Sequence, residues 1–544
     1  MTAAPILQVE GLRIALPPGA DRPLALDGLD LSVAPGEVVC LVGESGSGKS
    51  LAANAILRLL PPQVQATGGR ILLEGEDVAT KTEAEMRTLR GAKAAMIFQE
   101  PMTALNPQKT VGWQIDEVLR LHTDLNRRAR KARVLEILRD VQIPEPASAF
   151  NAYPHQISGG QRQRVMIAMA LVLNPRLLIA DEPTTALDVT TQKRILALIR
   201  DLQKKHDTGI LFITHDFGVV AEIADRIAVL RLGELVESSP AEQVLNHPQH
   251  PYTRALIAAV PALTPPAERP MSSAPVVLRA TGLHKTFAAR GGWLSGRRKA
   301  VAAVDDVGFA LRQGETLGVV GESGSGKTTV SRIVTRLLAA DAGAVELGGR
   351  DLLAAGRRDL RAMRCDIQMV FQDPMASLNP RKRVLDLIAQ GPIVQGVSRA
   401  EAHARARRLL ELVELTPAAA DRYPHEFSGG QRQRIGIARA LAMQPKVIVA
   451  DEPVSALDVS VQAQVLRLLA DLRERLDLSL LFVTHDLRVA AQLCDRILVM
   501  QKGQVVESGP TAQVFASPAH PYTQALLASI PGSDWQPPRL DVVA

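Results

Sequence analysis

Short apolar runs alternate with longer segments of mixed character along the whole chain. Three of these runs are typical of buried strands: residues 37–43, 176–181 and 210–214. The segments 160–173 and 191–202 predict helices, and residues 99–158, rich in Arg, Leu and Ala, predict a largely helical insertion. Strands that alternate with helices favour an α/β fold with a mainly parallel sheet.

This pattern occurs twice. GESGSGKS at 43–50 returns as GESGSGKT at 321–328, and YPHQISGGQRQR at 153–164 returns as YPHEFSGGQRQR at 423–434. From the SGGQ serine onward, equivalent positions lie 270 residues apart. The duplication predicts two domains of the same fold. We expect a first domain at 1–262, a linker rich in proline and small polar residues at 263–275, a second domain at 276–531 and a tail at 532–544.

Composition excludes some classes of protein. The chain has 544 residues, 46% of them hydrophobic and 22% charged, a balance typical of globular rather than disordered proteins. The net charge of +6 is dispersed and aromatic residues make up only 3%, so neither a basic patch for nucleic acid nor a platform for stacking bases is indicated. No nucleic-acid partner is therefore predicted.

Cysteine usage and hydropathy add two expected absences. Cys40, Cys365 and Cys494 are far apart, which predicts neither a disulfide framework nor a metal cluster. The N-terminus lacks the pattern of a signal peptide. Since no stretch approaches the roughly 18–20 apolar residues of a membrane span, we expect that the chain does not cross a membrane by itself.

A phosphate-binding loop follows a predicted strand in each repeat. The glycines of G-x-x-x-x-G-K-[ST] let the backbone approach a phosphate chain, the lysine neutralises the β- and γ-phosphates, and the following hydroxyl ligates Mg²⁺. The sequence thus predicts two ATP–Mg²⁺ sites. Their loop residues are Gly43, Ser45, Gly46, Gly48, Lys49 and Ser50 in the first repeat, and Gly321, Ser323, Gly324, Gly326, Lys327 and Thr328 in the second.

Paired carboxylates end a second apolar run in each repeat. Asp181 and Asp451 are predicted to hold the metal, and the adjacent Glu182 and Glu452 to polarise the attacking water. A carboxylate that caps a strand-end turn is the alternative. The upstream phosphate loop favours the catalytic role.

Histidine and glutamine supply further candidates. His215 and His485 each follow an apolar strand, 34 residues after the aspartate, and are predicted to contact the γ-phosphate and hold the water and glutamate in line. Gln99 and Gln372 can ligate Mg²⁺ or the water through the side-chain amide.

The SGGQ motifs are predicted to begin helices. The serines, Ser158 and Ser428, cap the helix, and the glycines, including Gly160 and Gly430, bare N–H groups that can bind an anion. An ordinary helix cap remains the alternative for these residues.

Together GESGSGK[ST], SGGQRQR, ADEP, ALD and THD resemble the ABC ATPase family over nearly the whole chain, twice. The resemblance implies two P-loop NTPase cassettes, each with a mainly parallel sheet, an antiparallel β subdomain and a helical insertion. It also implies a head-to-tail sandwich, in which Ser428 and Gly430 complete the first ATP site and Ser158 and Gly160 the second. Members often stack adenine on an aromatic residue; Phe287 is placed for this in the second repeat, but the first offers Leu16.

Other motifs resemble the ATPases of oligopeptide, dipeptide and nickel importers, and the fused arrangement resembles those of peptide, microcin C and glutathione importers. These motifs are QEPMTALNP, QDPMASLNP, YPHxxSGGQRQR and PxHPYTxAL. The resemblance implies a peripheral ATPase on the cytoplasmic face of the inner membrane, with two transmembrane permease subunits and, indirectly, a peptide-binding protein outside the cell. The alternatives are a soluble tandem ATPase acting on ribosomes or DNA, which the short proline-rich linker disfavours, and an importer for glutathione, nickel or sugar.

Two further hypotheses concern the edges of these motifs. Residues 100–107 and 373–380 are expected to form a groove for the permeases, so substitution of Leu105 or Leu378 should abolish transport and spare ATP hydrolysis. His250 and His520 of the HPYT motifs are interpreted as parts of a helix-start turn rather than as metal ligands.

Overall fold

The computed structural model describes residues 4–99, 104–184, 187–266, 273–287, 301–455 and 457–538. The chain divides into two compact units, one formed by residues 1–260 and 531–544 and the other by residues 261–530. Residues 531–538 therefore group with the first unit, and the start of the expected linker groups with the second. Each unit is an α/β cassette, as the duplication predicts.

A six-stranded sheet forms the centre of the first unit, in the order β10-β9-β3-β8-β7-β6. Its strands are β3 (Val38–Val42), β6 (Ala94–Ile97), β7 (Leu177–Asp181), β8 (Gly209–Ile213), β9 (Arg226–Arg231) and β10 (Glu234–Pro240). All neighbours pair in parallel except β9 and β10. The carboxyl ends of β6, β7, β8 and β3 therefore lie side by side at one edge, where ligands of such sheets bind.

A second sheet is antiparallel and has the order β2-β1-β4-β5. Its strands are β1 (Leu7–Ala15), β2 (Leu24–Val33), β4 (Gln65–Leu73) and β5 (Glu76–Asp77). The core of the unit lies between the two sheets and the first helix, where Leu26, Leu41 and Ala53 are buried together. Alternating burial along β2 gives that strand one face toward this core.

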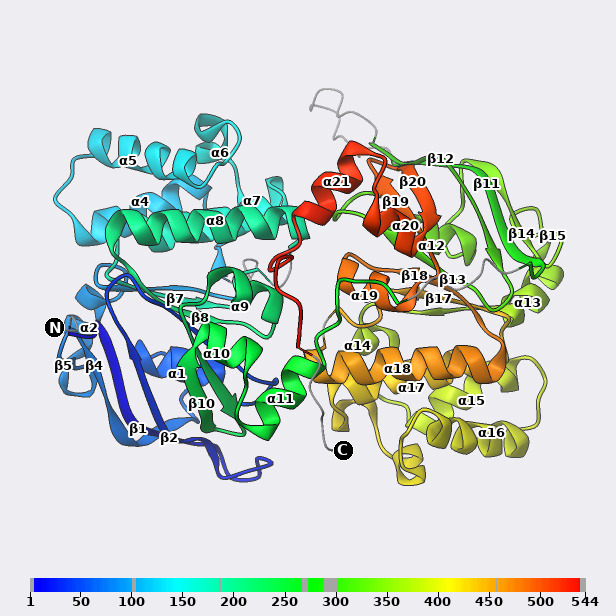
Figure 1. Cartoon of the computed structure of the whole chain (residues 1–544), viewed down its shortest axis with the longest axis horizontal. Coiled ribbons are helices and arrows are strands. Elements are labelled where there is room, and N and C mark those ends of the chain that lie inside the picture. The colour runs from blue at the N-terminus through cyan, green and yellow to red at the C-terminus, as the bar shows by residue number, and fades with distance from the viewer. Residues whose placement is uncertain are drawn as a thin grey trace. The chain divides into compact units, whose positions relative to one another are not determined.

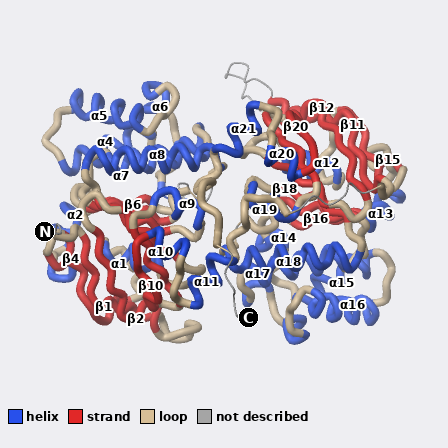
Figure 2. The backbone as a smooth tube through the Cα atoms, viewed as in Figure 1, coloured by secondary structure: helices blue, strands red, loops and turns tan. Residues whose placement is uncertain are grey.

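Helices cover the sheets and form the insertion of the first unit (Figures 1 and 2). They are α1 (Lys49–Ile56), α2 (Glu83–Leu89), α4 (Val111–His122), α5 (Arg127–Asp140), α6 (Pro146–Asn151), α7 (Gly159–Leu171), α8 (Val189–His206), α9 (Phe217–Ile223), α10 (Ala241–Asn246) and α11 (Pro251–Ala258). Single 3₁₀ turns lie at Val78–Thr80 and Pro154–Gln156. Helices α4 to α7 pack on one another, which confirms the helical insertion predicted between Gln99 and Ser158.

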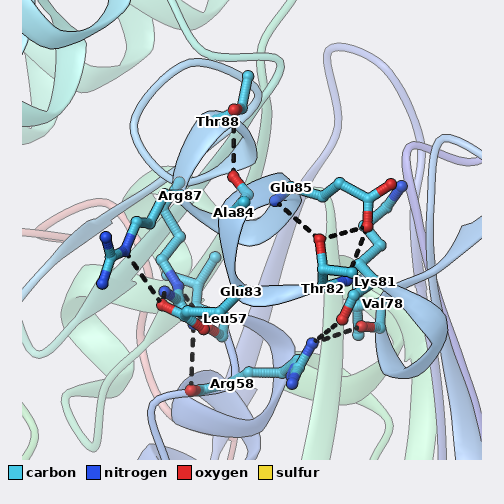
Figure 3. A network of polar contacts seen from close by, with 11 residues as sticks. Leu57, Arg58, Val78, Lys81, Thr82, Glu83, Ala84, Glu85, Arg87 and Thr88 are labelled. Atoms are coloured by element: carbon cyan, nitrogen blue, oxygen red, sulfur yellow. Dashed lines mark hydrogen bonds and ion pairs between the residues drawn. The ribbon is translucent and has the colours of Figure 1, made fainter.

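The start of α2 is held by a polar network next to α1 (Figure 3). The Thr82 hydroxyl accepts a hydrogen bond from the Glu85 N–H at 3.3 Å, and the Glu85 carboxylate accepts one from the Thr82 N–H at 2.7 Å, a capping box. Arg58, two residues after α1, donates to the carbonyls of Lys81 and Val78. The network thus ties α2 to the end of the helix that begins at Lys49.

The second unit repeats this plan. Its strands are β11 (Val276–Phe287), β12 (Val301–Arg312), β13 (Thr316–Val320), β14 (Ala342–Leu347), β15 (Arg350–Asp351), β16 (Ile367–Val370), β17 (Val447–Asp451), β18 (Ser479–Val483), β19 (Arg496–Gln501) and β20 (Gln504–Pro510). Its helices are α12 (Lys327–Val334), α13 (Arg357–Asp366), α14 (Pro374–Ser377), α15 (Val384–Val394), α16 (Arg399–Leu412), α17 (Gly429–Leu441), α18 (Val459–Leu476), α19 (Leu487–Leu493), α20 (Thr511–Ala516) and α21 (Pro521–Ala528), with 3₁₀ turns at Pro417–Asp421 and Pro424–Glu426. The sheet orders, β12-β11-β14-β15 and β16-β17-β18-β13-β19-β20, match those of the first unit.

Candidate ATP sites

The phosphate loop connects β3 to α1 and curves around its own lysine. Lys49 is the first residue of α1 and is only 6% exposed; its Nζ donates to the carbonyls of Gly43 at 2.7 Å and Glu44 at 2.9 Å. Gly48 has φ +107°, and a Cβ there would lie 2.7 Å from the Ala25 carbonyl oxygen, so only glycine fits. The loop therefore presents its N–H groups and a buried positive charge at the start of a helix.

The second loop has the same geometry. Lys327 begins α12, and its Nζ donates to the carbonyls of Gly321 at 2.7 Å and Glu322 at 2.9 Å. The lysine is 5% exposed. Both sequence-predicted loops are thus built for a phosphate chain.

Two of the three predicted metal ligands of each site, the hydroxyl and the aspartate, meet beside its loop. The Ser50 hydroxyl donates to Asp181 Oδ1 at 3.1 Å, and the Thr328 hydroxyl donates to Asp451 Oδ1 at 3.3 Å. Burial raises the pKa of Asp181; the Ser50 hydrogen bond opposes this, and the charge of Glu182 adds to it. A hydroxyl and a buried carboxylate at this distance are the donor set that suits Mg²⁺.

The glutamate, histidine and glutamine form one cluster in the first unit. His215, which follows β8, places Nδ1 3.0 Å from Glu182 Oε1, and the Gln99 amide nitrogen donates to Glu182 Oε2 at 2.8 Å. Glu182 follows β7 with φ +45°, a left-handed backbone that a non-glycine residue adopts only when its surroundings hold it. Three residues far apart in the sequence thus converge on one carboxylate.

The second unit repeats the cluster. His485 Nδ1 lies 3.2 Å from Glu452 Oε2, the Gln372 amide donates to the same oxygen at 2.9 Å, and Glu452 has φ +47°.

These contacts shift the pKa values in the second unit. Burial alone would raise the pKa of Glu452, but the hydrogen bond and charge of His485, with the charge of Lys327, hold that pKa below its usual range. Burial would likewise lower the pKa of His485, yet Glu452 raises it overall. Burial also raises the pKa of Asp451.

The SGGQ motifs begin helices, as predicted. Ser158 caps α7 and Ser428 caps α17, each in a capping box with the glutamine three residues later. Gly160 and Gly430 lie in the first turns of these helices. One capped helix, α7, belongs to the first unit and the other, α17, to the second.

The adenine side differs between the repeats. Phe287 ends β11 with its side chain 45% exposed, and the Lys285 Nζ lies 5.9 Å from its ring centroid. Leu16 instead packs against the core of the first unit. Phe287 thus offers an exposed aromatic surface that Leu16 does not.

The HPYT motifs touch the phosphate loops, which the sequence reasoning missed. His250 caps α11 by accepting the Tyr252 N–H at Nδ1, and Pro251 takes the first helical position, so the helix-start interpretation is confirmed. The Tyr252 hydroxyl in turn accepts the N–H of Glu44 at 3.2 Å. Burial raises the pKa of Tyr252 to about 12.

The second HPYT motif does the same: His520 caps α21, and the Tyr522 hydroxyl accepts the Glu322 N–H at 3.1 Å. The only sequence signal for this role was the return of the motif at the end of both repeats.

Leu105 and Leu378 do not line a surface, contrary to expectation, whereas the groove at 100–107 and 373–380 stays a prediction. Both side chains are only 2% exposed, so they belong to the core and present no surface to a partner. Met375, at 44% exposure, is a large apolar side chain that reaches solvent in the second segment. Residues 100–103 of the first segment lie outside the described residues.

Fold and sites together define a tandem P-loop ATPase. The pattern of the ABC transporter family (ABC_tran) matches residues 26–185 and 304–455, and that of the oligopeptide/dipeptide transporter C-terminal region (oligo_HPY) matches residues 236–290 and 506–540. The chain belongs to the ABC transporter family. It is an ATP-binding subunit of the peptide-transporter type, an ATPase that couples ATP hydrolysis to transport.

Two relatives match over nearly the full length. The chain is 49% identical over 528 residues to the peptidoglycan transport ATP-binding protein YejF of Agrobacterium fabrum, covering 96% of each chain. It is 48% identical over 568 residues to the glutathione import ATP-binding protein GsiA of Escherichia coli K12, covering 98% of this chain and 90% of the relative.

A solved structure, the dimer of the bacterial ABC transporter cassette MJ0796, aligns at 30% identity over 43% of this chain and 98% of its own, with a TM-score of 0.39. Among the described residues, no helix is both long and apolar enough to span a bilayer.

Proposed function

We propose that the chain energises a peptide importer and that both of its cassettes, predicted at 1–262 and 276–531, hydrolyse ATP. The observation that carries the proposal is the duplicated cluster: Glu182 with His215 and Gln99, and Glu452 with His485 and Gln372. In some tandem ATPases one site lacks a catalytic group. Here both sites hold the same side chains at nearly the same distances.

Each side chain of the first site has a role in this proposal. Lys49 binds the β- and γ-phosphates, Glu182 polarises the attacking water, and His215 fixes Glu182 and contacts the γ-phosphate. Ser50, Asp181 and the amide oxygen of Gln99 would hold Mg²⁺; when bound, the ion neutralises phosphate charge. Because the amide nitrogen of Gln99 is engaged by Glu182, its oxygen is the atom left for the metal.

The second site assigns the same roles to Lys327, Thr328, Asp451, Glu452, His485 and Gln372. Ser428 and Gly430 would complete the first site, and Ser158 and Gly160 the second, by offering the capped N-terminus of a helix to the γ-phosphate. This pairing rests on the family resemblance. It makes each ATP a bridge between cassettes.

The cargo class rests on three supports. The oligopeptide/dipeptide region occurs twice, one relative is named for peptidoglycan transport, and another for glutathione import. All three point to peptide-like solutes, glutathione among them. We infer two permease subunits and an external binding protein as partners, and a peripheral position on the cytoplasmic face of the inner membrane.

The first test is ATP turnover by the purified chain. Glu182→Gln and Glu452→Gln should each lower turnover strongly, and the double variant should retain ATP without hydrolysing it. If one single variant turns over like the unaltered chain, that site is not catalytic. Cys365→Ser is the control for the preparation of variants, because Cys365 lies in α13 and contacts Arg361 rather than a residue of either cluster.

The second test is uptake by vesicles that contain the chain and its permeases. A di- or tripeptide should be taken up at the expense of ATP, and glutathione should compete. Uptake of neither would overturn the cargo class while leaving the ATPase assignment intact.

A further inference from the structure

Each unit is completed by a segment that follows the last helix of the other repeat. Residues 261–266 follow α11 but belong to the second unit, and residues 531–538 follow α21 but belong to the first. The chain crosses between units at Val260–Pro261 and at Ile530–Pro531, positions that are equivalent in the two repeats. The exchange is therefore reciprocal.

The exchanged segments reach the helices that follow the two histidines. Gln492, in α19, donates through its side-chain amide to the carbonyls of Ala262 at 2.8 Å and Thr264 at 2.9 Å. Glu222, in α9, accepts the N–H of Gly532 at 3.1 Å. Glu222 and Gln492 are equivalent residues, 270 apart, and so are Ala262 and Gly532.

The tail contact in the first unit is close. A Cβ on Gly532, at φ +60°, would lie 2.6 Å from the Gly218 carbonyl oxygen, and one on Gly218 would lie 2.8 Å from the Pro531 carbonyl oxygen. Trp535 anchors the segment further along by donating its indole N–H to Asn246 in α10 at 3.2 Å. Gly218 is three residues after His215, so the tail packs on the first turn of the helix that follows the histidine.

The helices that precede the exchanged segments, α11 and α21, contact the phosphate loops near their N-terminal ends. Tyr252, in α11, holds the Glu44 N–H of the first loop, and Tyr522, in α21, holds the Glu322 N–H of the second. Each helix has 8 residues and spans about 12 Å. One end of each therefore contacts the ATP loop of its own cassette. The chain beyond the other end contacts the helix that follows the histidine of the other cassette.

We propose that the two HPYT helices, α11 and α21, are connectors, each linking the phosphate loop of one ATP site to the helix that follows the histidine of the other. The α11 connector runs from Tyr252 to Gln492, which lies in α19 seven residues after His485, and the α21 connector runs from Tyr522 to Glu222, which lies in α9 seven residues after His215. Loading of one loop is thereby transmitted to the catalytic geometry of the other site. The residues at the connector ends are positioning residues and do not touch the reacting atoms.

The functional test follows turnover at one site while the other is silenced, and so rests on the proposed catalytic glutamates. In a Glu182→Gln chain only the second site works. In this chain, Gln492→Ala should lower the kcat of the second site about fivefold with little change in KM for ATP. Glu222→Ala, the equivalent substitution in the first unit, should change the kcat of the second site less than 1.5-fold. In a Glu452→Gln chain the pattern should reverse.

The connector itself is tested by a double variant. In the Glu182→Gln chain, Tyr252→Phe should lower second-site kcat about threefold, but should have no added effect once Gln492→Ala is present. If the two effects multiply instead, Tyr252 acts on the second site by another route and the connector is overturned. If Tyr252→Phe alone leaves second-site turnover unchanged, the connector is likewise overturned.

A geometric test is independent of catalysis. With cysteines at positions 246 and 535, a short bis-maleimide should join the two positions within a single chain, whereas Asn246→Cys alone should give no such product. Absence of the intrachain product would overturn the exchange. If the product forms but neither Glu182→Gln nor Glu452→Gln affects turnover, the proposed function fails while the exchange stands.

Discussion

The two cassettes agree at the reacting groups and differ around them. Both bury the loop lysine and place the histidine within 3.2 Å of the glutamate. Ser331 places its hydroxyl 3.3 Å from Asp451 Oδ2 in the second cassette, whereas alanine, Ala53, stands at the equivalent place in the first. Phe287 is exposed where Leu16 is partly buried against the core. The same side chains therefore occur in both clusters, and we expect the differences to affect how tightly nucleotide and metal are held.

Removal of each histidine tests most directly whether the two sites are catalytically equivalent. We expect His215→Ala in a Glu452→Gln chain, and His485→Ala in a Glu182→Gln chain, to lower kcat by about 10³-fold, within the range for a positioned proton-transfer or orienting group. Single-turnover hydrolysis of bound ATP measures both. Effects that differ by more than tenfold would show that the two sites are not catalytically equivalent.

The next largest effect concerns stability. Leu105→Ala and Leu378→Ala should each cost about 3 kcal/mol of unfolding free energy, because each removes a buried side chain and leaves a cavity. Denaturant unfolding followed by circular dichroism measures this. Met375→Ala, an exposed control, should change it by about 0.5 kcal/mol or less. If Met375→Ala lowered the free energy of unfolding as much as Leu378→Ala does, the result would contradict the burial of Leu378 and the exposure of Met375.

A smaller effect sharpens the difference on the adenine side. Phe287→Leu should weaken ATP binding at the second site about fivefold, since stacking contributes about 1 kcal/mol. Equilibrium ATP binding is measured on the Glu182→Gln, Glu452→Gln chain with and without Phe287→Leu. We expect two different affinities with Phe287 present and two similar affinities with Phe287→Leu. Two unequal affinities that survive Phe287→Leu would place the asymmetry elsewhere.

The smallest expected effect concerns the metal side. Ser331→Ala removes a hydroxyl beside Asp451 and should raise the Mg²⁺ concentration for half-maximal second-site turnover about twofold, the loss of one modest hydrogen bond. Ala53→Ser is the matched variant and should lower that concentration at the first site. A tenfold shift in either variant would mean that the hydroxyl itself binds the metal.

Much of the sites could be predicted from sequence because their residues end strands in a known order. The loop follows β3, Asp181 ends β7 and His215 follows β8, and β7-β8-β3 are neighbours in a parallel sheet. Once the sheet is inferred, these residues must meet at its carboxyl edge. Predicted strands and helices also agree with the observed ones to within a few residues at their ends.

Other features depend on contacts that no local pattern reveals. The Tyr252 contact with Glu44 joins residues 208 positions apart, and the positive φ of Glu182 is set by its surroundings rather than by its own preference. Leu105 was misjudged because an apolar residue in a motif looks the same whether it packs inward or faces a partner. The placement of residues 531–538 on α9 could not be foreseen, since their sequence carries no periodic signal.

The reciprocal exchange of segments has a consequence for dividing the chain. A gene cut between residues 275 and 276 would yield two polypeptides, and neither would carry every residue of its own compact unit. The first would lack the tail that covers Gly218, and the second would lack the residues that Gln492 binds. Each fragment would need the other to complete its unit, so the fusion supplies in one translation product what two separate polypeptides would have to obtain by association.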